Sequence, residues 1–512
     1  MLVKTYGSAI YGVNALTITV EVSVEPGVNF TLVGLPDNAV KESQQRIDSA
    51  LHQYGYRIPG RKIVINMAPA DMKKEGSAYD LTLAIGILAA SEQIQSDGIG
   101  DYIIMGELSL DGGLQPIKGV LPIAIEARSK GFKGIILPKA NAREAAIVND
   151  LEVYGADNIG QVIDFFNGKS ELEKTEVDTR KEFYNSLNEY EFDFSDVKGQ
   201  ENIKRALEIA AAGGHNVILI GPPGSGKTML AKRMPSILPP LNLFESLETT
   251  KIHSVAGKMK REDALISVRP FRNPHHTISD VALVGGGSNP QPGEISLAHN
   301  GVLFLDELPE FKRAVLEVLR QPMEERRITI SRSKMTTEYP ASFILVAAMN
   351  PCPCGYYNHP DIECTCNPGV VNKYLNKVSG PLMDRIDLHI EVTPLSHSAL
   401  SEKKLGEPSE AIRQRVMNAR KIQEERYKDN KGIYCNAQMT TKLFRQYCDI
   451  DEECQNLMKM AMDKLGLSAR AYDRILKVSR TIADLDNSEK ITVVHLSEAI
   501  NYRSLDRDSW GR

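Results

Sequence analysis

The stretch VILIGPPGSGKTMLAK, residues 217–232, decides the fold of the central part of this chain. Residues 217–220 form an apolar run that is typical of a buried parallel strand. The run breaks into GPPGSGKT (221–228), which is the full G-x-x-x-x-G-K-[ST] pattern, and the residues after it favour a helix. This strand–loop–helix arrangement predicts a binding site for a nucleoside triphosphate. The alternative, a glycine-rich turn with an incidental lysine, leaves both flanks unexplained.

Each residue type in this loop has an expected role. The glycines let backbone N–H groups turn toward phosphate oxygens, and the helix N-terminus adds its dipole. Lys227 is expected to reach the β- and γ-phosphates, and Thr228 to hold Mg²⁺. The predicted ATP-binding residues of the loop are Gly221, Pro222, Pro223, Gly224, Ser225, Gly226, Lys227 and Thr228.

Two later apolar runs end on polar residues suited to hydrolysis. The run GVLFLDEL (301–308) ends on two acids. We expect Asp306 to hold Mg²⁺ through water and Glu307 to orient and deprotonate the attacking water. The run SFILVAAMNP (342–351) ends on Asn350, whose amide can bind that water or the γ-phosphate. The alternatives are two acids facing solvent and an asparagine that caps a turn.

The segment SGPLMDRIDLHIEV (379–392) places Arg385 between two aspartates. An arginine at the end of a helix and before a strand can reach the γ-phosphate held by a neighbouring subunit. The segment resembles the arginine-finger motif of Mg-chelatase and MCM ATPases. In the alternative interpretation, Asp384 and Asp387 hold Arg385 in a surface ion pair.

Composition bounds the class of protein. The chain has 512 residues, 42% hydrophobic and 25% charged, and a net charge of −5. This length predicts about three or four domains, and the charge means that nucleic-acid contacts must come from local basic loops. No apolar run approaches the roughly 18 residues that a membrane span needs, and the first residues lack the apolar core of a secretory signal. We therefore expect a cytoplasmic protein without a membrane partner.

The patterns along the chain predict four parts. Residues 1–166 alternate strand and helix patterns and predict an α/β domain, with strands at 16–24, 62–67, 103–108 and 134–138 and an apolar helix at 79–91. Residues 167–191 are charged and without periodicity, as in a linker. Residues 192–397 hold the nucleotide motifs on a parallel sheet, and residues 398–512 are predicted to be a helical lid.

The first part resembles a known domain. The segments APADMKKEGSAYDLTLAIGIL (68–88) and GELSLDGGLQPIKGVLPIAIEARSKGFKGIILP (106–138) are similar to the C-terminal domain of Lon-type proteases. That family uses a Ser–Lys dyad. The matching serine position falls on Ala78, and the matching lysine position falls near Leu121 or Ile123. A serine without a nearby base is a weak nucleophile, so we expect a scaffold domain; Ser77 and Lys118 remain as a shifted pair.

Nearly the whole chain resembles the ComM/YifB family of Mg-chelatase-like AAA+ ATPases. The strings that carry this resemblance are RPFRNPHHTISDVALVGGGSNPQPGEISLAHNGVLFLDELPEF (269–311), CPCG (352–355) and LSARAYDRILKVSRTIADL (467–485). The resemblance implies a hexameric motor that translocates on single-stranded or branched DNA and promotes branch migration during recombination. It also implies that Arg470 is the sensor 2 arginine, which closes over the γ-phosphate, with Arg474 as its rival.

Two inserted segments are expected to contact DNA. DVALVGGGSNPQPGE (280–294) is rich in glycine and proline, as a mobile loop would be. RRITISRSKMTTEYP (326–340) predicts a hairpin with Arg332 and Lys334 near its tip. A basic tip can hold backbone phosphates without reading bases, which suits a translocating motor. The alternative is an ordinary solvated hairpin.

Four of the seven cysteines predict a metal site. Two Cys-x-Cys pairs, Cys352 with Cys354 and Cys364 with Cys366, can present four thiolates to one structural Zn²⁺. Four thiolates leave no open position for catalysis, and His359 is a spare ligand. The alternatives are unligated thiols or an oxidation-sensitive loop. Cys435, Cys448 and Cys454 lie scattered over the helical part and are predicted to be ordinary thiols.

The sequence therefore predicts an ATP-driven ring motor that requires ATP and Mg²⁺ and acts on DNA. A second hypothesis is a chelatase-type remodelling ATPase that acts on a protein or tetrapyrrole partner. A third is an ATP-dependent protease, which requires a working Ser–Lys pair in the first domain.

Overall fold

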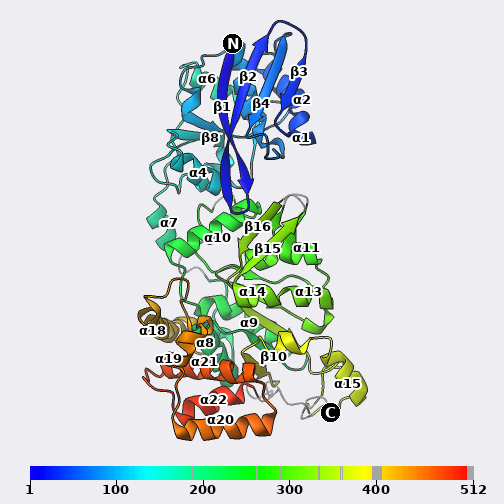
Figure 1. Cartoon of the computed structure of the whole chain (residues 1–512), viewed down its shortest axis with the longest axis vertical. Helices are drawn as coiled ribbons and strands as arrows, with labels where there is room; N and C mark the ends of the chain where they lie inside the picture. Colours follow the sequence, from blue (N-terminus) through cyan, green and yellow to red (C-terminus); the bar gives the residue numbers. More distant parts are fainter. Residues whose placement is uncertain are drawn as a thin grey trace.

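The computed structural model describes residues 1–185, 190–260, 263–287, 290–332, 335–357, 359, 361–394 and 406–503. Along its longest axis, an α/β unit lies at one end, a second unit with a parallel sheet lies in the middle, and helices lie at the other end (Figure 1). This order follows the chain, as the sequence predicts.

The first unit is built on a seven-stranded mixed sheet. Its strands, in spatial order, are β3 (Phe30–Val33), β4 (Lys62–Ala68), β2 (Asn14–Glu25), β1 (Leu2–Tyr11), β5 (Tyr102–Ile104), β8 (Gly134–Pro138) and β9 (Glu152–Ala156). β1 and β2 form a long antiparallel hairpin, and β2 alternates buried and accessible residues as its sequence predicts. Its helices are α1 (Asn38–Lys41), α2 (Ser43–Gln53), α3 (Asp80–Ala90), α4 (Val120–Ser129), α5 (Lys139–Ala145) and α6 (Ile159–Phe166).

The predicted elements of this unit recur with small shifts. Every residue of α3 is buried, which explains its continuous apolar run. The apolar run 103–108 is not one strand, because it divides between β5 and β6 (Glu107–Leu108), and β6 pairs with β7 (Leu114–Gln115). Short 3₁₀ turns lie at Ser77–Tyr79 and Ile99–Asp101.

The charged segment 167–191 is more than a linker. It contains the short helix α7 (Thr179–Asn185), and Phe183 is buried in the core of the first unit. The same core receives Leu241, Ala264 and Leu265 from the central part of the chain. A few apolar residues in a charged segment produce no periodic pattern in the sequence. Only the tertiary structure shows that such residues pack into the core of the first unit.

The central unit is a five-stranded parallel sheet. Its spatial order is β11 (Phe271–Arg272), β14 (Val302–Leu305), β17 (Ile344–Met349), β10 (Val217–Ile220) and β18 (Leu388–Glu391). All four neighbouring pairs are parallel, so the carboxyl ends of the strands share one edge of the sheet. Polar residues that follow different strands therefore meet at this edge.

Helices cover both faces of this sheet. Val217 and Leu219 face α8 (Glu201–Gly213), α9 (Lys227–Ile237) and the C-terminal helices, while Ile218 and Ile220 face the opposite core. The elements on that opposite side are α11 (Asp280–Val284), α12 (Glu294–Leu297), α13 (Arg313–Val318), α14 (Arg320–Glu325), α15 (Pro368–Leu375) and α16 (Gly380–Met383). α10 (Leu243–Val255) joins the two units, because Gly119 before α4 donates a backbone hydrogen bond to Ser254.

The two inserted segments differ from each other. β15 (Arg327–Arg332) and β16 (Met335–Pro340) form the predicted hairpin. Residues 280–294 were expected to form a mobile loop. Their described residues instead form α11, capped by Ser279, and a ladder between β12 (Gly285–Gly286) and β13 (Gln291–Pro292). A Cβ on Gly285 would lie 2.3 Å from the carbonyl oxygen of Gln291. Only glycine therefore allows β12 and β13 to pair this closely.

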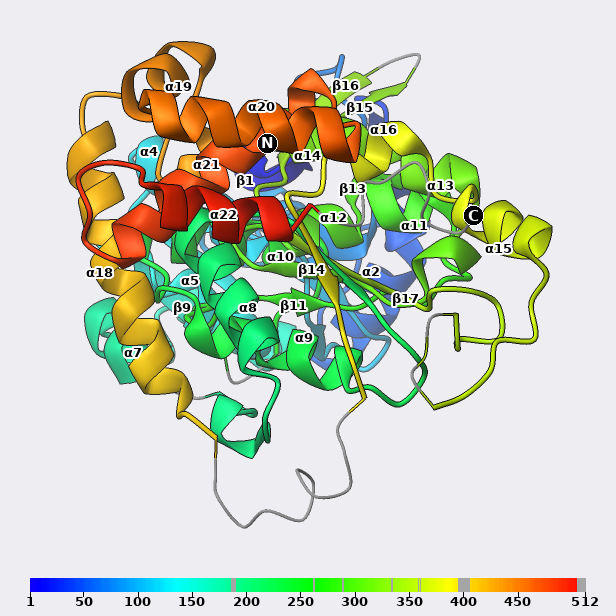
Figure 2. The same cartoon turned by 90° about the horizontal axis from the view of Figure 1, so that it is seen from below.

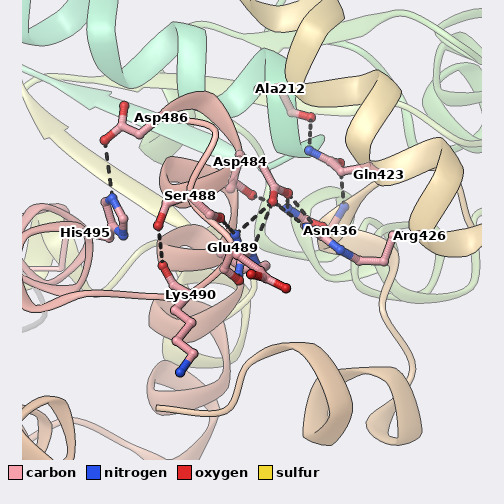
Figure 3. A network of polar contacts seen from close by, with 12 residues as sticks. Ala212, Gln423, Arg426, Asn436, Asp484, Asp486, Ser488, Glu489, Lys490 and His495 are labelled. Atoms are coloured by element: carbon pink, nitrogen blue, oxygen red, sulfur yellow. Dashed lines mark hydrogen bonds and ion pairs between the residues drawn. The ribbon is translucent and has the colours of Figure 1, made fainter. Parts of the chain in front are cut away.

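The C-terminal helices match the predicted helical patterns and pack beneath the parallel sheet (Figure 2). They are α18 (Ser409–Tyr427), α19 (Thr441–Tyr447), α20 (Glu452–Leu465), α21 (Ala469–Leu485) and α22 (Val493–Asn501). A buried polar network joins α18, α21 and the turn at Asn436–Gln438 (Figure 3). Both guanidinium ends of Arg426 and the amide of Asn436 bind Asp484. Gln423 links this network to the carbonyl oxygen of Ala212 on α8.

Candidate active site and metal centre

The phosphate loop has the backbone conformation that its glycines permit. Gly224 and Gly226 have φ angles of +77° and +89°. A Cβ on Gly221 would lie 2.3 Å from the carbonyl oxygen of Val392, so only glycine fits where the loop leaves β10. α9 begins directly after the loop at Lys227, which gives the predicted strand–loop–helix unit.

Lys227 and Thr228 connect the loop to residues that follow β17 and β14. The ammonium of Lys227 donates to the carbonyl oxygens of Gly221 and Pro222, each at 2.8 Å. It also donates to Asn350 Oδ1 at 3.2 Å, and burial lowers its pKa. Thr228 Oγ1 donates to Asp306 Oδ2 at 2.7 Å. These two oxygens lie where hard oxygen ligands could together hold Mg²⁺ beside a triphosphate.

Glu307 has a partner that the sequence did not indicate. Its side chain is 57% exposed at the carboxyl edge of the sheet, and its φ of +53° lies in the left-handed region. His276 Nδ1 lies 3.3 Å from Glu307 Oε2. His276 follows β11, which pairs with β14, so parallel topology brings it beside Glu307. The pair of adjacent histidines in the sequence was the available signal.

Arg385 lies at the other edge of the sheet. It precedes Asp387, whose backbone N–H donates to the carbonyl oxygen of Asn216, the residue before β10. The four residues of β10 span roughly 13 Å, so this edge is well separated from the loop that follows the strand. Arg385 Nη2 lies 2.7 Å from Glu324 Oε1, and its side chain is only 9% exposed. The structure does not bring Arg385 to the phosphate loop of its own chain.

The two candidate sensor arginines lie at this same edge. Arg470 Nη1 lies 3.7 Å from Asp384 Oδ2, and Arg474 pairs with the buried Asp387. Burial opposes ionisation of Asp387, but Arg474 and His215 outweigh it and hold its pKa well below the usual range. Arg470 is the more exposed of the two arginines. Neither side chain faces the phosphate loop of its own chain.

Four cysteines lie together in the loop after β17. The sulfur of Cys352 is 3.3 Å from that of Cys354 and 3.7 Å from that of Cys364. All four sulfurs, including that of Cys366, lie within 4.8 Å of one another. Zinc with Zn–S bonds of about 2.3 Å would hold four sulfurs about 3.8 Å apart. The cluster is therefore compatible with a tetrahedral structural zinc site.

The chemistry of these thiols also suits a metal. Burial opposes ionisation of Cys354, but hydrogen bonds from the Tyr356 amide and the Cys352 thiol lower its pKa to about 6. A hydrogen bond from the Cys366 backbone favours the Cys364 thiolate, but burial and the neighbouring Cys354 and Cys352 sulfurs outweigh it and raise the pKa of Cys364. His359, the spare ligand of the sequence prediction, accepts the backbone N–H groups of Asp361 and Ile362 and is not part of the cluster.

The first unit holds a cavity of about 360 Å³, and residues named in the comparison with Lon-type proteases line it. Ser77 and Lys118 both line it, but the Ser77 hydroxyl donates to Glu107 Oε2 at 2.5 Å. The backbone N–H of Leu121, the matched lysine position, donates to Glu144 at 3.0 Å. Val255 of α10 and Gln291 of β13 close one side of the cavity. The Ser77 hydroxyl therefore binds a carboxylate, and among the described residues no hydrogen bond joins it to Lys118, so the Ser–Lys dyad is not formed.

The side chains that were predicted to contact DNA lie outside the described part of the chain. Lys334 lies outside the described residues, and so does the side chain of Arg332. The backbone of the hairpin up to Arg332 is described, and its strand β16 lies against the first unit, where Tyr11 donates to the carbonyl oxygen of Thr336. Among the described helices, none is both long enough and apolar enough to cross a membrane.

Comparisons with protein families match all three parts of the chain. Residues 193–400 match the magnesium chelatase subunit ChlI family, residues 20–141 match the family "subunit ChlI of Mg-chelatase", and residues 406–503 match the ChlI C-terminal family. With the phosphate loop, Asp306 and the parallel sheet in place, the chain is a Mg-chelatase-like AAA+ ATPase.

Full-length relatives narrow this class. The chain is 46% identical over 505 residues to YifB of Escherichia coli, covering 98% of this chain and 96% of that protein. It is 44% identical over 509 residues to the competence protein ComM of Haemophilus influenzae, covering 99% and 98%. The magnesium-chelatase 38 kDa subunit of Cereibacter sphaeroides is 24% identical over 179 residues, 31% of this chain and 53% of that protein. The chain belongs to the ComM/YifB family, as its sequence motifs predict.

Proposed function

We propose that this protein is a ring-forming AAA+ motor, a homohexamer, that hydrolyses ATP, translocates on single-stranded or branched DNA and promotes branch migration or unwinding during homologous recombination of the natural-transformation type. The observation that carries the proposal is a separation within one chain. Lys227, Thr228 and Asp306 lie at the carboxyl edge of the parallel sheet, whereas Arg385 belongs to its amino edge.

This separation supports a shared active site. An arginine finger must contact the γ-phosphate to stabilise the charge of the transition state. Arg385 is anchored beside Asn216, a strand length away from the loop of its own chain. A neighbouring subunit would supply the missing arginine if the face that carries its Arg385 packed against the phosphate loop of this subunit. Head-to-tail contacts of this kind can close into rings. Arg470, beside Asp384, would approach the same neighbouring nucleotide.

DNA is the substrate that the similarities favour. The full-length relative ComM carries the name competence protein. In the sequence, Arg332 is the last residue of β15 and Lys334 directly precedes β16, and six copies around a pore would concentrate positive potential. We also propose the cytoplasm as the location, zinc at the four cysteines, and a Lon-like scaffold role for the first unit.

The deciding experiment measures ATP turnover alone, with single-stranded DNA and with a four-way junction. We expect DNA to raise the rate, and Lys334→Ala to abolish this stimulation while basal turnover remains. The matched control is Lys459→Ala, which removes an exposed lysine from α20. A rate that ignores DNA but rises with a protein partner would favour a different function. Loss of basal turnover in Lys334→Ala would mean that this residue serves hydrolysis and not DNA.

A second candidate function is remodelling of a protein or tetrapyrrole partner. The matches to the magnesium chelatase ChlI families favour it, although the relatives named magnesium-chelatase subunits cover only about a third of this chain. Proteolysis is not proposed, because the Ser77 hydroxyl binds Glu107 and the matched dyad positions hold Ala78 and Leu121.

A further inference from the structure

The loop that carries the four cysteines lies against the phosphate loop. β10 and β17 are neighbouring parallel strands, so the loops that follow them leave the sheet side by side at its carboxyl edge. Gly355, the residue after Cys354, is buried, and a Cβ added to it would lie 2.5 Å from Cδ and 3.2 Å from Cγ of Pro223. The ring of Pro223 in the phosphate loop therefore rests directly on the backbone of the cysteine loop.

A tight turn fixes the position of Gly355. Its backbone N–H donates to the carbonyl oxygen of Cys352 at 3.0 Å, so residues 352–355 form a turn that holds the first two cysteines. Its φ of +89° lies in the left-handed region, which glycine adopts without strain. Both the turn and the contact with Pro223 therefore require glycine at this position.

Both ends of the cysteine loop also meet the ATP site. Cys352 follows Asn350 by two residues, and Asn350 Oδ1 accepts a hydrogen bond from Lys227 Nζ at 3.2 Å. At the other end, α15 begins two residues after Cys366 and carries Tyr374, whose hydroxyl accepts the backbone N–H of Asn350. A displacement of the cysteine loop would therefore disturb this asparagine as well as the phosphate loop.

The cysteine cluster is the main feature that can order this loop. Among the described residues between β17 and α15, none belongs to a helix or a strand. The two cysteine pairs meet in the cluster, where the sulfur of Cys364 lies 3.7 Å from that of Cys352 and 3.5 Å from that of Cys354. Thiols form only weak hydrogen bonds, whereas zinc would bond all four sulfurs. The metal would therefore determine how firmly the turn at Gly355 is held.

We propose that the four-cysteine loop is a metal-dependent support of the phosphate loop. With zinc bound, the turn at Gly355 holds Pro223 in the conformation that binds the phosphates of ATP or ADP. Without zinc the support loosens, and the affinity for nucleotide falls. The inference rests on the ATP-hydrolysing part of the proposed function and on zinc as the metal, but it is independent of DNA. It gives the cluster a part in nucleotide binding, beyond the stability of its own loop.

The first test changes the contact and leaves every sulfur in place. Gly355→Ala places a methyl group against Pro223, and we expect it to weaken binding of Mg·ADP to the full chain by about tenfold in calorimetric titrations. The zinc content should be unchanged. Gly131→Ala is the matched control, because Gly131 has a φ of +79° and a Cβ there would meet nothing within 4 Å. It adds similar backbone strain in the first unit and should leave the affinity for Mg·ADP unchanged.

A compensating change distinguishes a support from general damage to the loop. Pro223→Ala removes Cγ and Cδ, the two atoms nearest to the added methyl group. The double variant Pro223→Ala with Gly355→Ala should therefore bind Mg·ADP more tightly than Gly355→Ala alone. Equal affinities of these two variants would overturn the proposal, and so would an unchanged affinity in Gly355→Ala. Loss of zinc from Gly355→Ala would overturn it too, because this glycine would then serve the cluster alone.

Removal of the metal tests the dependence on zinc directly. Zinc is stripped from the full chain with a chelator, the chelator is removed, and Mg·ADP is titrated before and after zinc is restored. We expect the affinity to fall by about tenfold and to return with zinc, and Gly355→Ala to respond less because its support is already disturbed. An affinity that does not respond to zinc would overturn the proposal. Stimulation by DNA is a separate measurement, so failure of the motor function would leave this result intact.

Discussion

Arg470 Nη1 lies 3.7 Å from Asp384 Oδ2, so the first helical turn of α21 is anchored beside the residue that precedes Arg385. The sequence motifs predict that Arg385 acts on a neighbouring subunit and that Arg470 closes over a γ-phosphate. Asp384 is the chain neighbour of Arg385, so both arginines lie at the same edge of the sheet. If one of them acts in trans, we expect the other to act on the same neighbouring nucleotide.

A subunit-mixing experiment tests this arrangement. Lys227→Ala and Arg385→Ala should each abolish ATP turnover when pure. Mixed in equal amounts, they should recover turnover at about a quarter of the sites, because a random ring pairs an intact loop with an intact arginine at that frequency. Arg470→Ala should behave like Arg385→Ala in the same assay. A mixture no more active than its parts would exclude a shared site, and Arg445→Ala on α19 serves as the unaffected control.

The contact between His276 and Glu307 predicts a loss of catalytic rate without a loss of ATP affinity. His276→Ala should lower kcat by about tenfold, because Glu307, the expected general base, would lose the group that positions it. ATP binding, measured by titration, should be unchanged. The neighbouring His275 binds Thr277 and offers a matched control, so His275→Ala should turn over ATP at nearly the normal rate. Equal losses in the two variants would remove the assigned role.

The cysteine cluster predicts one zinc ion per chain. Cys364→Ser should lose the metal and lower the melting temperature, because the loop after β17 would lose its cross-link. Cys448→Ser is the control, since Cys448 is buried in the helical part and lies outside the cluster. Metal analysis of the purified proteins decides the matter. Equal zinc content in both variants and in the unaltered protein would contradict the assignment.

The buried pair of Arg474 and Asp387 predicts a pH-dependent contribution to stability. Arg474→Met should lower the free energy of unfolding at neutral pH by about 3 kcal/mol, because it leaves a buried carboxylate poorly compensated. The folded-state pKa of Asp387 is depressed, so its contribution is full above the ordinary value of about 4 and declines as the pH falls below it. Chemical unfolding of both proteins across this range provides the measurement. A difference that grows in acid would contradict the sign.

Much of the fold was predictable because the informative patterns are local. The run 217–220 is a fully buried strand, and α18 and α21 lie within residues 398–512, the part that was predicted to be helical. The predictions of individual elements were wrong where tertiary contacts determine the local structure. Residues 103–108 divide into two strands, residues 280–294 include α11 and a short ladder, and the charged segment 167–191 contributes the buried Phe183.

The sequence by itself determined the nucleotide chemistry, because the order strand, glycine loop, lysine and helix specifies a phosphate cradle within sixteen residues. It also determined the family, through motifs spread over nearly the whole chain. Only the tertiary structure decided which edge of the sheet each arginine occupies and that His276 meets Glu307. It alone placed Gly355 of the cysteine loop against Pro223 of the phosphate loop. These relationships join residues tens to hundreds of positions apart, and no local periodicity encodes them. They exist because parallel strands bring distant loops to one edge of the sheet.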